Sequence, residues 1–380
     1  MRTVHSEDLQ SGMITARAVY TANGQLIIPV GTPLTSQLIS RINFYGISSI
    51  QIEHTSDQGE YLKPLIPQKI LSPGPSPIPN EKTSPVHNRS YSQIVQQSPK
   101  FQDFQISYSK KINSTQSALD HFLTSDEVDT RSLLNETVNL IQDSQLTVME
   151  LFDMLHNMRQ VDDTIYAHSL NVSLLARVLG KWLNFTAEEI DTLTIAGLLH
   201  DIGKLKIPES IIKKPGKLTE EEYDIIKMHP RIGFETIEKS VLDLRIKQAI
   251  LMHHERCDGS GYPFGFQKDD LSPFSMVLAI VDVYDAMTAA RSYRGPLCPF
   301  SVIQQFEDEG LQKYNPKFIL TFLEHIAATY QNNRVLLSNG RRATIVMINK
   351  HRLSRPIVQF EDESFLDLSK QTALSITAVI

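Results

Sequence analysis

The sequence predicts a mainly α-helical protein that carries small β-containing units at its two ends. Apolar residues recur every three or four positions from Leu133 to Met158, a spacing typical of amphipathic helices. Two helix-start signals, at residues 186–189 and 219–222, lie in the same central region. The pairs Asn23-Gly24 and Asn339-Gly340 separate strand-like segments near the ends, as expected of β-hairpins.

The composition is that of a globular protein with more than one structural unit. The chain has 380 residues, more than a single domain usually holds. A net charge of −6 argues against binding to a nucleic-acid polymer, which requires a basic surface. A small anionic ligand needs only a local group of cations and stays open. Cys257 and Cys298 are the only cysteines, too few for a disulfide framework, and they fit a reducing compartment.

No segment of the sequence has the pattern of a signal peptide or of a membrane span. The first residues lack the apolar core of a signal peptide. A run of about 18 apolar residues, which a membrane-spanning helix requires, does not occur. The most apolar segment, Ser275 to Met287, is interrupted by Asp282 and Asp285. We therefore expect a cytoplasmic protein with no membrane span.

Residues 1–60 are expected to form a small α/β module. The pattern predicts a strand pair around Asn23-Gly24, a short helix over residues 35–45 and a strand over residues 47–52. This module is either a structural appendage or a regulatory unit that binds a signalling partner. Residues 61–114 are expected to be a flexible linker, because eight prolines between Pro64 and Pro99 alternate with polar residues.

A helical domain is expected over residues 115–330 and a small β unit over residues 331–380. The apolar stripe between Leu133 and Met158 is interpreted as core packing. If part of it were exposed, it would instead form the seam of a homodimer. The β unit is expected to contain a hairpin about Asn339-Gly340 and further strands over residues 355–360 and 365–368.

The helices of this domain place candidate metal ligands at defined positions. His168 lies in the first turns of a helix over residues 167–182. The capping box Thr186-Ala-Glu-Glu189 opens a helix that delivers His200 and Asp201 and is expected to end at Gly203.

Three more helices bring the remaining candidates. The capping box at residues 219–222 opens a helix that carries His229 and is expected to stop at Pro230. A helix over residues 242–252 delivers His253-His254, and the helix that follows Pro273 carries Asp282 and Asp285. Positions fixed by packed helices hold a site more firmly than loops do.

The densest chemical motif is His-His-Glu-Arg-Cys-Asp-Gly-Ser-Gly-Tyr-Pro, residues 253–263. Taken alone, it is either a solvated loop or a metal site, and any single histidine is more often a core imidazole. The other histidines decide between these interpretations, because five of the 12 in the chain lie between His168 and His254. Together with Asp201 and Asp282 they form a ligand set that suits Fe, Mn or Zn. Cys257 is expected to be a free thiol rather than a ligand.

These motifs carry a family resemblance. His200-Asp201, in His-Asp-Ile-Gly-Lys, resembles the signature doublet of the HD superfamily of metal-dependent phosphohydrolases. Residues 253–263 resemble the defining motif of its HD-GYP subgroup, and the resemblance covers residues 150–330. Such proteins hydrolyse cyclic di-GMP, a bacterial second messenger. The resemblance implies an all-helical HD domain and a phosphodiesterase.

The expected site holds two divalent transition-metal ions, with Fe or Mn favoured and Zn open. A water between them would become the hydroxide that attacks the phosphodiester. Asp201 is suited to bridging the ions, and catalytic roles fall on His200, Asp201 and Lys204. The expected metal ligands are His168, His200, Asp201, His229, His253, His254 and Asp282.

Substrate contacts are expected from four side chains. Lys204 can place an ammonium against a phosphate oxygen, and Tyr262 can face a guanine or a phosphate. Arg291 and Arg294 can add phosphate contacts, as residues at matching positions do in HD-GYP proteins. The alternative for these two arginines is a surface ion pair.

One position departs from part of the family. Some HD-GYP proteins hold a third metal through a glutamate four residues before the first histidine, where this chain has Thr164. We therefore expect a two-metal site and linear pGpG, rather than GMP, as the main product. Two other functions stay open. The site could act on another cyclic dinucleotide or nucleotide phosphate, or the protein could be a non-catalytic cyclic di-GMP sensor or scaffold.

Overall fold

In a computed structural model the chain forms two compact units, residues 1–83 and 84–380. The structure describes residues 95–125, 129–158, 164–288 except 215, and 297–380 of the second unit. In the first unit it describes residues 2–53 except 11, 21–25, 29, 35–38, 40, 41, 43–46 and 48.

The first unit contains two antiparallel strand pairs. Strand β1 (Arg2–His5) pairs with β4 (Ser49–Ile52), and β2 (Val19–Tyr20) pairs with β3 (Leu26–Ile28). The strands predicted on both sides of Asn23-Gly24 and over residues 47–52 are thus confirmed. The turn itself and most of the helix predicted over residues 35–45 lie outside the described residues. Alternate strand residues form a small core with Leu9, Leu34 and Ile42: Val4, Val19, Ile28, Ile50 and Ile52.

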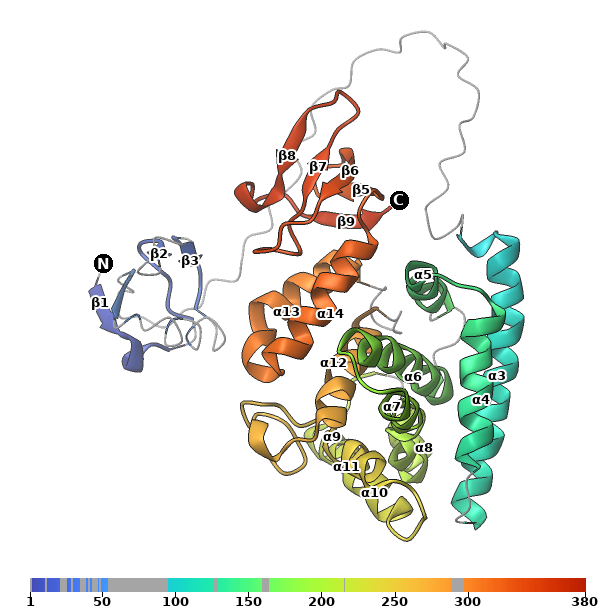
Figure 1. The fold of residues 1–380 in the computed structure, drawn as a ribbon. Coiled ribbons are helices and arrows are strands. Elements are labelled where there is room, and N and C mark those ends of the chain that lie inside the picture. The colour runs from blue at the N-terminus through green and yellow to red at the C-terminus, as the bar shows by residue number, and fades with distance from the viewer. Residues whose placement is uncertain are drawn as a thin grey trace. The chain divides into compact units, whose positions relative to one another are not determined.

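The second unit is mainly helical, which confirms the predicted fold class (Figure 1). Within the described part of the chain, no helix has both the length and the apolarity needed to cross a bilayer. The helices are α3 (Pro99–Ser125), α4 (Thr130–Asp143), α5 (Val148–Met158), α6 (Ile165–Trp182), α7 (Ala187–Leu199), α8 (Glu209–Ile212), α9 (Glu220–Lys227), α10 (His229–Ile237), α11 (Leu244–Met252), α12 (Pro273–Thr288), α13 (Pro299–Lys313) and α14 (Pro316–Thr329).

Helix α3 corrects the predicted extent of the linker. The prediction that residues 61–114 form a flexible linker is wrong for residues 99–114, which are helical. Proline is tolerated in the first turn of a helix, so Pro99 opens α3 rather than preventing it. Phe101, Phe104 and Tyr108 follow at helical spacing and are buried, so they form an apolar face for the helix. The prolines and polar residues that precede Pro99 drew attention away from this spacing in the sequence.

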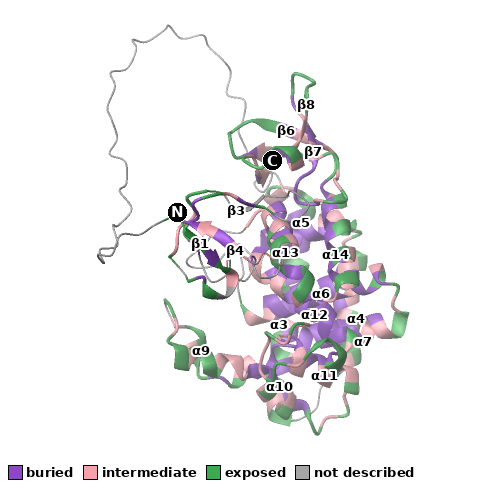
Figure 2. Ribbon diagram, turned by 90° about the vertical axis from the view of Figure 1, so that its left-hand side faces the viewer, coloured by how far each residue is buried: buried purple, intermediate pink, exposed green. Residues whose placement is uncertain are grey.

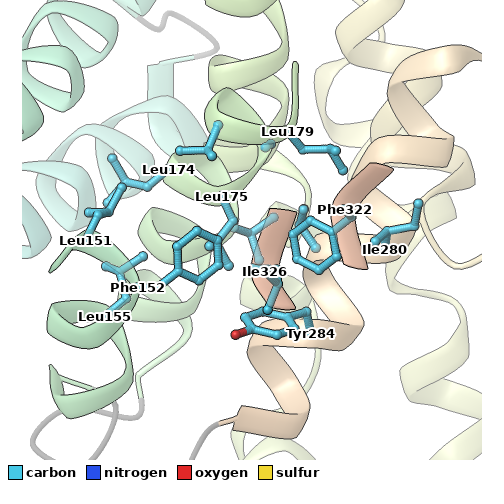
Figure 3. Packing of buried hydrophobic residues seen from close by; sticks show 14 of the residues in the cluster. Leu151, Phe152, Leu155, Leu174, Leu175, Leu179, Ile280, Tyr284, Phe322 and Ile326 are labelled. Carbon is cyan, nitrogen blue, oxygen red and sulfur yellow. The ribbon is translucent and has the colours of Figure 1, made fainter. Parts of the chain in front are cut away.

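The core of the second unit lies where α5, α6, α12 and α14 meet (Figure 3). Phe152 contacts the edge of the Tyr284 ring, with the ring centroids 5.8 Å apart. Leu151, Phe152 and Leu155 belong to this core, so the interpretation of the stripe between residues 133 and 158 as core packing is confirmed. It runs over two helices, α4 and α5. Figure 2 shows α6 and α12 largely buried, whereas α9 has no buried residue.

The C-terminal residues form a five-stranded antiparallel sheet in the order β8-β7-β6-β5-β9. The predicted hairpin about Asn339-Gly340 joins β5 (Arg334–Leu337) to β6 (Arg342–Met347), and Gly340 has the positive φ, +81°, that the turn requires. The strands predicted after it are β7 (Ile357–Gln359) and β8 (Phe365–Asp367), whereas β9 (Ile376–Val379) was not predicted. Val335, Ile345 and Val358 of this sheet share the core of the helices.

Helices α6 and α7 cross at a point where only glycine fits. A Cβ atom on Gly197 would lie 2.6 Å from Cα of Ser173, closer than nonbonded carbon atoms approach. The crossing sets the spacing between the start of α6, which carries His168, and the end of α7, which is followed by His200. Gly310 in α13 is different, since a Cβ there would find its nearest atom at 3.4 Å.

We predict that Gly197→Ala lowers the free energy of unfolding by about 1–3 kcal/mol, because the backbones of α6 and α7 must separate. The matched Gly310→Ala variant should be neutral or up to about 1 kcal/mol more stable, because alanine favours helix. Urea unfolding followed through the fluorescence of Trp182, the single tryptophan, measures both. Equal effects of the two substitutions would contradict the close-crossing argument.

Candidate metal centre

The predicted metal ligands come together from separate helices. His168 lies on α6, and His200 and Asp201 follow the last residue of α7. His229 opens α10, His253 and His254 follow α11, and Asp282 lies on α12. His254 is half-buried, and the other six side chains are buried.

The ligand atoms form two adjacent groups. His168, His200 and Asp282 make one, the His168 group; Asp201, His229, His253 and His254 make the other, the His229 group. Within each group, the atoms that could bind a metal all lie within 4.8 Å of one another. This separation is suited to four- to six-coordinate ions with imidazole and carboxylate ligands.

The carboxylate of Asp201 faces both groups. Its Oδ2 atom lies 3.4 Å from Nε2 of His200 and 3.6 Å from Nε2 of His168. Its Oδ1 atom lies 3.2 Å from Nε2 of His229 and 3.8 Å from Nε2 of His253. Each oxygen is thus directed at a different group, which is the arrangement that a bridging carboxylate needs.

Backbone carbonyls fix the tautomer of three histidines. The Nδ1–H of His200 donates to the carbonyl of Gly197 over 2.8 Å, and His229 and His253 make the same bond, over 2.7 Å, to the carbonyls three residues before them. Since a carbonyl can only accept, Nδ1 carries the proton, and Nε2 of the neutral ring keeps its lone pair. Such anchoring is typical of metal-binding histidines.

These lone pairs converge without a hydrogen between them. Nε2 of His229 lies 3.1 Å from Nε2 of His253 and 3.2 Å from Oδ1 of Asp201. Among the described residues, Nε2 of His200 and Oδ1 of Asp201 are buried atoms with no hydrogen-bond partner. Unpaired buried acceptors carry a large desolvation cost. Cations bound between them would remove this cost, so the residues fit a metal centre.

The electrostatics favour the ligand forms of most of these side chains. Burial lowers the pKa of His200 and holds the pKa values of His253 and His254 well below the usual range, so these imidazoles are neutral. Burial acts against ionisation of Asp201, but its polar and charged surroundings, which include the ammonium group of Lys204, outweigh it and hold its pKa well below its usual range. A charged carboxylate beside neutral imidazoles is the state that binds a cation.

His168 differs from the other histidines. Burial disfavours its charge, but hydrogen bonds to Asp282 and Asp285 prevail and raise its pKa to about 9. Its Nδ1 lies 2.7 Å from Oδ2 of Asp285, and its Nε2 lies 3.0 Å from Oδ1 of Asp282. Asp285 therefore holds the Nδ1 side of the ring, while Nε2 faces the site. The sequence analysis gave Asp285 no role; its signal was its position three residues after Asp282 on one helix face.

The predicted substrate-binding residues are placed differently from one another. Nζ of Lys204 lies 2.6 Å from Oδ2 of Asp201, at the edge of the two groups. The ring of Tyr262 stacks on that of His254, with the centroids 4.6 Å apart. Arg291 and Arg294 lie outside the described residues.

Two predicted helix ends are wrong. Gly203 does not end α7, which stops at Leu199; it lies in a 3₁₀ helix, Ile202–Lys206. A Cβ on Gly203 would meet the carbonyl oxygen of His229 at 2.0 Å, so glycine is needed for close packing against α10. Pro230 does not stop a helix but lies in the first turn of α10, where its missing N–H is not required.

The loop after His254 is held by a buried carboxylate that the sequence analysis gave no role. Glu255 is 1% exposed and accepts hydrogen bonds from the backbone N–H groups of Phe264, at 2.7 Å, and Phe266, at 3.1 Å. A Cβ on Gly261 would lie 2.4 Å from Cα of Glu255, so the loop folds directly over this residue. The Tyr262–Pro263 peptide bond is cis. This packing keeps Tyr262 against His254.

Two further residues are explained by the structure. The Thr164 hydroxyl caps α6 by accepting from the N–H of Ala167 over 3.2 Å. Cys257 belongs to neither ligand group among the described residues and is a free cysteine, as predicted. Burial raises the pKa of its thiol, which disfavours the thiolate that binds metals.

Comparison with known proteins identifies similar sequences. Residues 142–318 match the family described as HD domain. The chain is 31% identical over 210 residues to a cyclic di-GMP phosphodiesterase of Pseudomonas aeruginosa, covering 54% of this chain and 50% of that protein. It is 33% identical over 186 residues to a cyclic di-GMP phosphodiesterase of Thermotoga maritima, covering 48% and 50%.

A third relative carries a different substrate in its name. The chain is 34% identical over 193 residues to 3′3′-cGAMP-specific phosphodiesterase 2 of Vibrio cholerae, covering 50% of this chain and 37% of that protein. The chain thus spans about half the length of these relatives, or less.

We predict that Glu255→Gln loosens the loop that follows His254. Each carboxylate oxygen of Glu255 accepts from a backbone N–H group, and glutamine would replace one of these oxygens with an NH₂ group that cannot accept. Loss of a hydrogen bond to a charged group costs about 1.5–3 kcal/mol, so the amides of Phe264 and Phe266 should exchange with deuterium about 10 to 100 times faster. Glu209→Gln, which alters an exposed ion pair with Lys213, is the control. Unchanged exchange in the loop would show that Glu255 does not hold it.

Proposed function

We propose that the protein is a metal-dependent phosphodiesterase of the HD-GYP type that opens cyclic di-GMP by hydrolysing a 3′–5′ phosphodiester. The match of residues 142–318 to the HD domain family and the motif at residues 253–263 support this proposal. The observation that carries this proposal is the convergence of unprotonated nitrogen and oxygen atoms around Asp201. A sensor that only bound the nucleotide would have no need for this costly arrangement. The similarity to cyclic di-GMP phosphodiesterases of two bacteria supports the substrate.

Each of the two groups would hold one divalent ion, with Asp201 shared between them. His168, His200 and Asp282 would bind the first ion, and His229, His253 and His254 the second. When bound, such ions lower the pKa of water, supply a nucleophile near neutral pH and neutralise charge on the phosphate. Fe and Mn are our first choices for the metal, and Zn suits the same ligands.

The chain's own residues would position the substrate and keep the ligands in place. Lys204 lies beside Asp201 and can direct its ammonium to a phosphate oxygen. Tyr262, held against His254 by the loop that Glu255 organises, presents an aromatic ring on which a guanine can stack. The carbonyl-anchored imidazoles cannot rotate, so little reorganisation is needed when the phosphate binds. Arg291 and Arg294 remain predicted phosphate contacts.

A second candidate function is hydrolysis of a related cyclic dinucleotide. It is favoured by the similarity to a 3′3′-cGAMP-specific phosphodiesterase, which is comparable in extent to the similarity to the cyclic di-GMP enzymes. The two substrates differ in one purine, so the metal ligands do not distinguish them. The non-catalytic sensor or scaffold remains the alternative from outside the enzymes.

Other features of the chain stay predictions. A cytoplasmic location, a homodimer and a signalling partner bound through residues 1–60 each follow from the sequence alone. Two ions per chain and pGpG as main product also belong to this proposal.

We predict that Asp201→Asn abolishes hydrolysis of cyclic di-GMP, by at least about a thousandfold, and lowers the bound metal below two ions per chain, because the bridging charge is lost. Asp191→Asn removes a carboxylate from α7, the helix that ends just before His200 and Asp201; there Asp191 pairs with Arg177, and the variant serves as the control. Protein purified without oxygen is analysed for metal and incubated with cyclic di-GMP, and the products are separated by chromatography.

The same assay distinguishes the alternatives. Hydrolysis of 3′3′-cGAMP with intact cyclic di-GMP would move the assignment to the second candidate. If protein that holds two ions hydrolyses neither nucleotide with Fe, Mn or Zn, the non-catalytic sensor or scaffold becomes the remaining interpretation. Protein that retains no metal would overturn the metal centre itself.

We predict that Thr164→Glu adds a third ion and shifts the product from pGpG towards GMP, because a carboxylate one turn before His168 can join the His168 group. The variant also loses the cap on α6, at a cost of about 1 kcal/mol. Thr164→Gln loses the same cap without gaining a carboxylate and is therefore the matched control. A metal count of two in both variants would refute the prediction.

A further inference from the structure

A chain of buried hydrogen bonds leads from α3 to the metal-facing ring of His168. The hydroxyl of Tyr108, on α3, donates to Oδ1 of Asn171 over 2.5 Å. Nδ2 of Asn171 donates to Oδ1 of Asp285 over 2.9 Å, and Oδ2 of Asp285 lies 2.7 Å from Nδ1 of His168. Three helices, α3, α6 and α12, contribute to this chain.

The polarity of the chain is fixed by chemistry at each step. The ionised carboxylate of Asp285 can only accept, so both Asn171 and His168 must donate to it. Asn171 then directs its carbonyl oxygen at Tyr108, whose hydroxyl donates. Tyr108 and Asn171 are fully buried, and Asp285 is 2% exposed, so water does not readily replace a lost partner.

The first member lies outside the region that matches the HD domain. That region comprises residues 142–318, whereas Tyr108 belongs to α3, which begins at Pro99. The hydroxyl of Tyr108 also lies 3.2 Å from the carbonyl oxygen of Ala167, the residue before His168. Helix α3 therefore contacts both the backbone next to His168 and the hydrogen-bond chain behind its ring.

We propose that Tyr108, Asn171 and Asp285 are positioning residues that hold His168 in its metal-binding orientation, so that the affinity of the His168 group for its ion depends on α3. The proposal rests on the proposed metal centre and is independent of which nucleotide is hydrolysed. His168 is the one proposed ligand in this series of hydrogen bonds, whereas His229 and His253 are anchored by backbone carbonyls and reach it only through Asp201, which lies 3.6 Å from His168. Loss of the Tyr108 hydroxyl should therefore weaken binding of the ion in the His168 group more than binding of the other ion.

Tyr108→Phe is the first test, because it removes one hydroxyl and keeps the buried ring. Tyr166→Phe is the matched control, since the Tyr166 hydroxyl also joins α6 to α3, by a 3.3 Å hydrogen bond to Asp120, away from the site. The affinities of both ions are measured with Mn²⁺ in competition with a chelating indicator dye, without substrate. Substitutions behind a metal-binding histidine typically cost 10- to 100-fold in affinity. We expect a fall of about tenfold for one ion in Tyr108→Phe and none in Tyr166→Phe.

A double-mutant cycle distinguishes an effect transmitted through the hydrogen bonds of Tyr108, Asn171 and Asp285 from a general loss of stability. Asp285→Asn removes the charge that His168 contacts, and it should lower the affinity of the same ion by about 10- to 100-fold. If the three residues act in series, Tyr108→Phe should add little once Asp285 is changed. Urea unfolding of all variants shows whether any loss of affinity merely follows a loss of stability.

The outcomes distinguish this proposal from the proposed function. The proposal would be overturned if the losses of Mn²⁺ affinity from Tyr108→Phe and Asp285→Asn added fully in the double variant. It would also be overturned if Tyr108→Phe and Tyr166→Phe lowered the affinity equally. An equal fall in the affinity of both ions would also overturn it, because only the His168 group contains a ligand that the three residues hold directly. If the unchanged chain binds no Mn²⁺, the metal centre fails instead.

Discussion

The structure depends on one buried carboxylate. Asp201 is 1% exposed and is surrounded by four imidazoles and one ammonium group, and its two oxygens face different ligand groups. A buried carboxylate is tolerated only when positive charge or donors surround it. Several of the nitrogens that face it instead carry lone pairs and no proton. The N–H group of each of those imidazoles points away and donates to a backbone carbonyl. The centre is thus built for cations that the protein itself does not supply, and the fold must hold mutually repelling atoms together.

The fold meets this requirement with rigid close contacts rather than with long side chains. The crossing of α6 and α7 at Gly197 and the contact of Gly203 with the backbone of α10 leave no space even for a methyl group. The imidazoles of His200 and His253 donate to carbonyls three residues earlier, at the ends of the packed helices α7 and α11. Movement of any ligand therefore requires movement of a helix, which the apolar core of α5, α6, α12 and α14 resists.

Outer residues extend this control beyond the ligands themselves. Glu255 organises the loop that keeps Tyr262 against His254, so the ring proposed to stack on the substrate is held in place from behind. Behind the ring of His168, Asp285 and Asn171 link this histidine to α3. The first helix of the described second unit thereby becomes part of the centre, although it precedes the region that matches the HD domain. Such a link is a physical route by which a change at α3 would reach the metal.

The sequence by itself determined the features that follow from local rules. The capping boxes at Thr186 and Thr219 and the hairpin at Gly340 depend on neighbouring residues, and each formed as predicted. The candidate ligands could be named because five of the 12 histidines lie between residues 168 and 254, in motifs that resemble those of a known family. The roles of Gly203, Pro230 and Tyr108 were decided only by the tertiary structure. Gly203 was mistaken for a helix end because the contact it allows, with the backbone of His229, is made across 26 residues. Tyr108 was counted as linker because its partners, Asn171 and Ala167, are distant in the sequence. Helix starts and turns are set by a few adjacent residues, whereas hydrogen bonds between packed helices exist only once the core has brought those helices together.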